Sequence, residues 1–75
     1  MTDLKKEIGK KIKAARLNSG QTQADICDDE SELTIRQLAR IENGQAMPTV
    51  PKLMILSKKL GISVQSIVDL EKIEI

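Results

Sequence analysis

Short helices with clear starts and stops are the feature that most constrains this sequence. Four hydroxyl residues stand where a helix would begin: Thr22, Thr34, Thr49 and Ser63. Three glycines stand where a helix would end: Gly20, Gly44 and Gly61. A hydroxyl side chain accepts a hydrogen bond from the first turn of a helix, and glycine adopts the left-handed conformation that terminates one. The sequence therefore predicts an all-α fold, a compact bundle of about five short helices.

Apolar residues recur at helical spacing between these signals. We expect helices over residues 3–18, 22–27, 34–43, 49–60 and 63–68. The chain has no Phe, Tyr or Trp, so its core must be aliphatic. The fourth helix is expected to turn one stripe inward: Val50, Leu53, Leu56 and Leu60. We also expect Met54 at the core or its edge, and Ile55 facing outward.

Two of the helix starts are capping boxes. In a capping box, the side chain three positions after the hydroxyl residue accepts a hydrogen bond from the backbone N–H of that residue. Thr22 pairs with Asp25, and Thr34 pairs with Gln37. These boxes open two consecutive short helices, joined by the polar connector 28–32. Two short helices with a tight connector form a helix-turn-helix unit, whose second helix enters the major groove of DNA.

Composition excludes several other classes of protein. Zinc fingers are excluded because the chain has no His and a single cysteine, Cys27. We expect Cys27 to be a small buried residue. Single-strand and RNA binders stack bases on aromatic side chains, which this chain lacks. No small set of Asp, Glu or Lys stands out for acid–base chemistry. We therefore expect no enzyme activity, no metal and no cofactor.

The beginning of the chain is charged and has no apolar run, so it is not a signal peptide. No stretch is long enough to cross a membrane. A lone cysteine fits a reducing compartment. We expect a cytoplasmic protein that has no membrane partner.

Charge is unevenly distributed although the net charge is only +1. Basic residues load the first helix: Lys5, Lys6, Lys10, Lys11, Lys13 and Arg16. Acidic residues gather around the connector: Asp25, Asp28, Asp29, Glu30 and Glu32. A near-neutral total can hide a basic face opposite an acidic one, although charge runs are also typical of ordinary solvated surfaces. The acidic residues are expected to point away from DNA.

The helix 34–43 has the side chains that major-groove recognition requires. Arg36 and Arg40 lie one turn apart, and a guanidinium group matches O6 and N7 of guanine. Ile35 is suited to pack on a thymine methyl group, and Gln37 can bond a base or serve its cap. Before this helix, Thr22 and Gln23 open the preceding one, where the helix dipole favours a phosphate.

Several segments together resemble the Cro/CI-type (XRE) helix-turn-helix family: 23–26, 40–44, 48–49 and 60–63. The resemblance implies a lambda-repressor-like bundle that binds double-stranded DNA and regulates transcription. It places these residues in the groove: Thr34, Ile35, Arg36, Ala39 and Arg40. It places Gln23 and the loop 44–49, with Gln45 and Thr49, near phosphates. It also pairs Arg16 with Glu42 in a partly buried ion pair.

The segment 30–42 further resembles the DNA-binding domains of ComR and Rgg-like quorum-sensing regulators of streptococci, with a connector slightly longer than the usual family spacing. This resemblance implies a module over residues 1–70, and a tail or linker at 71–75 leading to a C-terminal domain that binds a peptide pheromone. The full protein would be a dimer and the isolated module a monomer. A protein inhibitor competing for the DNA-facing surface is a further candidate partner.

A second class of function stays open at this point. A free-standing small repressor, or the antidote of a toxin–antitoxin pair acting mainly through a protein partner, would use the same framework.

Overall fold

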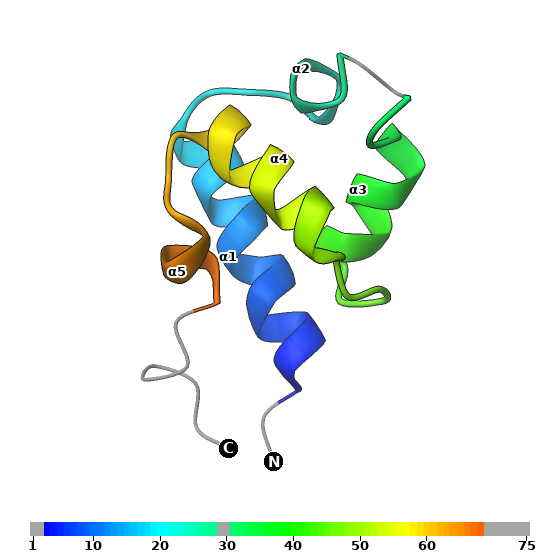
Figure 1. Cartoon of the computed structure of the whole chain (residues 1–75), viewed down its shortest axis with the longest axis vertical. Coiled ribbons are helices and arrows are strands. Elements are labelled where there is room, and N and C mark those ends of the chain that lie inside the picture. The colour runs from blue at the N-terminus through cyan, green and yellow to red at the C-terminus, as the bar shows by residue number, and fades with distance from the viewer. Residues whose placement is uncertain (1–2, 29–30, 69–75) are drawn as a thin grey trace.

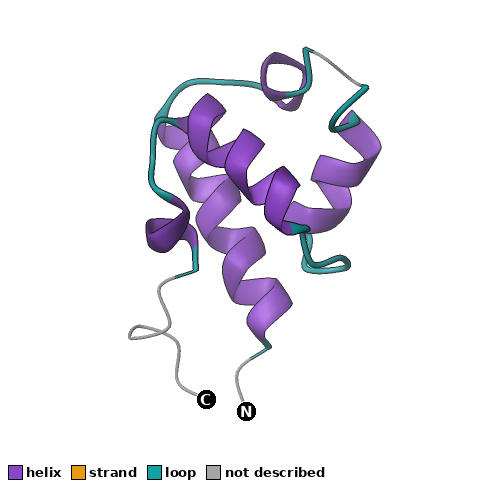
Figure 2. Ribbon diagram, viewed as in Figure 1, coloured by secondary structure: helices purple, strands orange, loops and turns teal. Residues whose placement is uncertain are grey.

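In the computed structural model, which describes residues 3–28 and 31–68, the chain forms five helices (Figure 1). Their bounds are α1 Leu4–Asn18, α2 Gln23–Ile26, α3 Ile35–Glu42, α4 Val50–Leu60 and α5 Val64–Ile67. Helices and loops account for all of the described residues, with no strand among them (Figure 2). The predicted all-α fold is confirmed. None of the helices in these residues is long and apolar enough to span a membrane.

The expected caps are formed at the predicted residues. The Thr22 and Thr34 hydroxyls accept hydrogen bonds from the backbone N–H groups of Asp25 and Gln37, at 3.1 and 3.0 Å. Thr49 and Ser63 cap α4 and α5 in the same way. Gly61 ends α4 with a φ of 70°, in the left-handed region that glycine adopts without strain. These caps fix helix ends because they satisfy backbone groups that a helix cannot satisfy internally.

The core is aliphatic and lies between α1, α3 and α4. α4 lies in front of α1 in Figure 1, with α3 on one side and α5 on the other. Three side chains at its centre, Ile12, Leu38 and Leu56, have no exposed surface. Cys27 is buried among them, as expected, with 3% of its surface exposed.

α1 and α3 touch backbone to backbone at Gly9. A Cβ atom at this position would lie 2.9 Å from the carbonyl oxygen of Glu42 and closer still to that of Ile41. Only glycine allows two helices to approach so closely here. The contact fixes how far α3 stands from α1.

Three expectations for α4 are wrong. Val50 is 68% exposed, because it lies at the first position of the helix and a quarter turn away from the stripe of Leu53, Leu56 and Leu60. Met54 is 61% exposed rather than at the core edge. Ile55 is partly buried rather than outward, because Asp28 and Glu32 of the connector lie beside it.

The connector is tied to the end of α4 by an ion pair. The ammonium group of Lys59 lies 2.7 Å from the carboxylate of Asp28. Both Asp28 and Glu32 are exposed. Asp29 and Glu30 lie outside the described residues, as do the expected domain end at residue 70 and the tail 71–75.

Candidate nucleic-acid interface

α3 turns one side into the core and the other toward solvent. Leu38, Ile41 and Glu42 are buried. The residues predicted to read bases share the opposite surface: Ile35, Arg36, Gln37 and Arg40 are exposed, and Thr34 and Ala39 are partly exposed. Ile35 keeps 38% of its surface exposed at the start of the helix. This side of α3 is therefore exposed to solvent in the described part of the chain.

The capping box at the start of α3 sets what Gln37 can offer. The side-chain oxygen of Gln37 accepts a hydrogen bond from the backbone N–H of Thr34 at 3.1 Å. The Thr34 hydroxyl accepts one from the backbone N–H of Gln37. The amide nitrogen of Gln37 is left to donate outward. Gln37 can thus act in its cap and still present a hydrogen-bond donor.

The buried side of α3 is joined to α1 by the expected pair of Arg16 and Glu42. The guanidinium Nε and Nη2 atoms donate to the two carboxylate oxygens, at 2.7 and 3.0 Å. The hydrogen bond with Glu42 raises the pKa of Arg16 above its ordinary value, and burial opposes this rise. Arg16 Nη1 also donates to the backbone oxygen of Gln21. The pair is therefore satisfied on all sides, like every other buried side-chain polar atom of the described residues.

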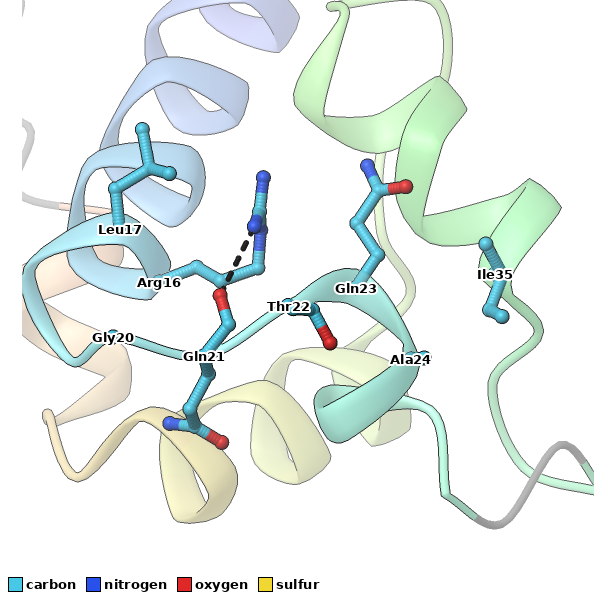
Figure 3. A pocket seen from close by; sticks show the side chains of 8 residues that line it. All are labelled: Arg16, Leu17, Gly20, Gln21, Thr22, Gln23, Ala24 and Ile35. Atoms are coloured by element: carbon cyan, nitrogen blue, oxygen red, sulfur yellow. Dashed lines mark hydrogen bonds between the residues drawn. The ribbon is translucent and has the colours of Figure 1, made fainter.

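Gln23 extends this network to α2. Its amide nitrogen donates to Oε1 of Glu42 at 3.2 Å, so the side chain is held over the ion pair. Figure 3 shows Arg16 and Gln23 pointing into the space between α1 and α3. One glutamate therefore fixes both the α1 arginine and the α2 glutamine.

An open hollow faces outward at this point. It is lined by residues of α1, α2 and the start of α3: Arg16, Leu17, Gly20, Gln21, Thr22, Gln23, Ala24 and Ile35 (Figure 3). The carboxylate of Asp25 accepts from the backbone N–H of Thr22 at 2.8 Å, so a negative charge already sits at the start of α2. A phosphate approaching this hollow would meet the amide of Gln23 rather than a bare helix end.

A second hollow lies beyond the other end of α3. It is lined by Gln37, Arg40, Ile41, Ala46, Met47, Pro48, Thr49 and Lys52. Two residues predicted to read bases, Gln37 and Arg40, thus come together with Thr49, which was predicted to contact phosphate. Gln45 is exposed in the same loop but does not line this hollow.

Comparison with known families decides the class of this fold. A family model described as "Helix-turn-helix" matches residues 12–67, which include α2, α3 and both hollows. The chain belongs to the helix-turn-helix family. The XRE-type membership predicted from the sequence is confirmed.

Solved structures of competence regulators resemble this helix-turn-helix chain closely. Apo ComR from Streptococcus vestibularis is 40% identical with a TM-score of 0.87, over 96% of this chain and 24% of that one. Apo ComR from S. thermophilus is 39% identical with a TM-score of 0.87, again over 96% and 24%. ComR from S. thermophilus in complex with DNA and its signalling peptide ComS is 38% identical, with a TM-score of 0.83, over 91% and 23%.

The similarity concerns one part of those proteins. The chain spans about a quarter of the length of the ComR chains that it matches, as the 24% coverage shows. A comparison of the chain with curated proteins found no match. Among the described residues, no group of three or more His, Cys, Asp or Glu could hold a metal ion.

Two residues of the helix-turn-helix surface were missed by sequence reasoning. Lys52 lies in the second hollow with Arg40, and its backbone N–H donates to the Thr49 hydroxyl. The cap at Thr49 places residue 52 in the first turn of α4, a signal that could have identified it. Leu17 is 59% exposed at the rim of the first hollow, which no sequence pattern indicates.

Proposed function

We propose that this chain is the sequence-specific DNA-binding module of a transcription regulator and that α3 reads bases in the major groove. The observation on which the proposal rests is the division of α3 into two sides. Glu42 and the core residues fix one side, and Ile35, Arg36 and Arg40 project from the other. A recognition helix requires this division, because base contacts need a rigid support.

Each outward side chain has a defined role in this proposal. Arg36 and Arg40 donate two hydrogen bonds each to guanine O6 and N7. Ile35 packs on a thymine methyl group, and Gln37 donates from its free amide nitrogen. Thr34 and Ala39 contact the bases they face.

Contacts to phosphates orient the helix without reading sequence. Gln23 and Thr22 contact one phosphate of the DNA backbone from the first hollow, and Thr49 contacts another from the second hollow. Gln45 contacts the backbone from the loop between α3 and α4. The module binds DNA and performs no chemistry on it, and it acts where the chromosome is, in the cytoplasm.

We place peptide sensing in a separate C-terminal domain, with residues 1–70 as the DNA-binding module. Support comes from the similarity to ComR bound to DNA and its signalling peptide ComS. In this proposal the pheromone-responsive protein dimerises through that domain, and residues 1–75 alone are monomeric in sedimentation equilibrium at micromolar concentration. A protein inhibitor of the regulator would compete for the surface of α3.

The test is selection of duplexes from random DNA by residues 1–75, followed by fluorescence anisotropy at one fixed salt concentration. Single base-pair changes in the selected half-site should each weaken binding by about 1–3 kcal/mol. Equal affinity for selected and shuffled duplexes would overturn the proposal. Such a result would favour the alternative in which the chain acts mainly through a protein partner.

A further inference from the structure

α1 has a row of residues on one side that the contacts described so far leave without a role. Lys6, Lys13 and Leu17 are spaced by seven and four residues, which are close to two turns and one turn of a helix. All three are exposed. They therefore form a single stripe along α1, which we call the α1 stripe.

Contacts at both ends show where the α1 stripe runs. At one end, Leu17 lines the first hollow together with Gln23 and Ile35, at the start of α3. At the other end, Lys6 lies against Gly44, just after α3, because a Cβ atom at Gly44 would be 2.6 Å from Cγ of Lys6. The α1 stripe therefore follows α3 from its beginning to its end, and joins the surface that α3 presents to DNA.

Within residues 3–28 and 31–68, no ion pair involves the two lysines of the α1 stripe. Neither Lys6 nor Lys13 has an acidic partner within the described part of the chain, whereas Lys10 lies 3.8 Å from Glu7. The exposed carboxylates of Asp28 and Glu32 line a different hollow, beside α4. Two free ammonium groups next to a DNA-facing surface suit an anionic partner, and continuity with that surface selects the DNA backbone.

We propose that Lys6 and Lys13 are additional phosphate-binding residues, which extend the DNA contact from α2 and α3 onto α1. This inference rests on the proposed function. The two lysines lie about 10 Å apart along the axis of α1, which corresponds to about three base-pair steps. The α1 stripe thus contacts two separate phosphates, and it contributes affinity without sequence preference.

The test compares the salt dependence of binding for wild type and the double variant Lys6→Gln/Lys13→Gln on the selected duplex. The slope of log K against log salt is negative, and each lost phosphate contact reduces its magnitude by about 0.9, so the magnitude should be smaller by about 1.8 in the double variant. Binding to unrelated duplexes should weaken by the same factor. The variant Lys6→Arg/Lys13→Arg should keep the wild-type slope, because it keeps both charges.

The matched control is Lys5→Gln/Lys58→Gln, which removes the same charge from exposed positions outside the α1 stripe. It should keep a slope near that of wild type. Equal slopes for the two glutamine variants would overturn the inference, because net charge alone would then explain the effect. If wild type itself does not prefer selected DNA, the proposed function fails instead, and the two failures are distinguishable.

Discussion

The two sides of α3 differ in what holds them in place. The buried side, with Leu38, Ile41 and Glu42, is packed and hydrogen-bonded to other helices. On the outward side, Arg36 and Arg40 are exposed to solvent. Substitutions on the buried side should act through folding, whereas substitutions of Arg36 and Arg40 should act through recognition alone.

α1 is the element that positions α3. Gly9 sets the distance between the two helices, and the ion pair of Arg16 and Glu42 sets the position along their contact. A buried ion pair contributes little net stability but is costly to break, so its role is to specify one arrangement. Gln23 donates a hydrogen bond to the same carboxylate and is also a proposed phosphate contact, so it belongs both to the buried network and to the DNA-facing surface.

The largest effect is expected at Glu42. Glu42→Ala should lower the free energy of unfolding by about 3–5 kcal/mol, because it leaves the buried Arg16 guanidinium without a carboxylate. Urea denaturation followed by circular dichroism measures this change.

Two further variants test the Glu42 prediction even if Glu42→Ala leaves this small domain unfolded. Glu42→Gln should cost less, because it retains an acceptor for Arg16. Arg16→Met/Glu42→Met should recover most of the lost stability, because no charge stays buried. A single alanine variant as stable as wild type would show that the pair does not hold α3.

The next effect is expected at Gly9. Gly9→Ala places a Cβ atom against the backbone of α3, and overpacking of this kind costs about 1–3 kcal/mol. Alanine is favoured over glycine in a helix by about 1 kcal/mol, so the net loss in unfolding free energy should be up to about 2 kcal/mol. Ala14→Gly, at an exposed position of α1, measures the helix preference separately. A stabilised Gly9→Ala variant would contradict the close contact.

The smallest effect is expected at Gln23. Gln23→Ala removes one hydrogen bond to Glu42 and one proposed phosphate contact, each worth about 0.5–1.5 kcal/mol. Stability should fall slightly, and affinity should fall by similar factors on selected and unrelated duplexes. A loss that depends on one base pair would instead make Gln23 a reader of sequence.

Local features of this fold could be predicted from the sequence, and contacts between distant segments could not. The caps at Thr22 and Thr34 depend on residues three positions away, so the sequence pattern was sufficient. The pair of Arg16 and Glu42 joins residues 26 positions apart, and only the family resemblance indicated it. Ile55 was assigned wrongly because the connector lies beside that flank of α4, which helical periodicity alone does not reveal. Met54 was assigned wrongly because it lies more than a quarter turn away from the stripe of Leu53, Leu56 and Leu60, and it is 61% exposed.

Removal of the outward arginines tests the central claim most directly. Affinity for the selected half-site and for a shuffled duplex is measured by anisotropy at fixed salt, for Arg36→Ala and Arg40→Ala. Each variant should lose about 1–3 kcal/mol on the selected duplex and less on the shuffled one, with an unchanged thermal midpoint. Wild-type affinity for the selected half-site in both variants would contradict the assignment of α3 as the recognition helix.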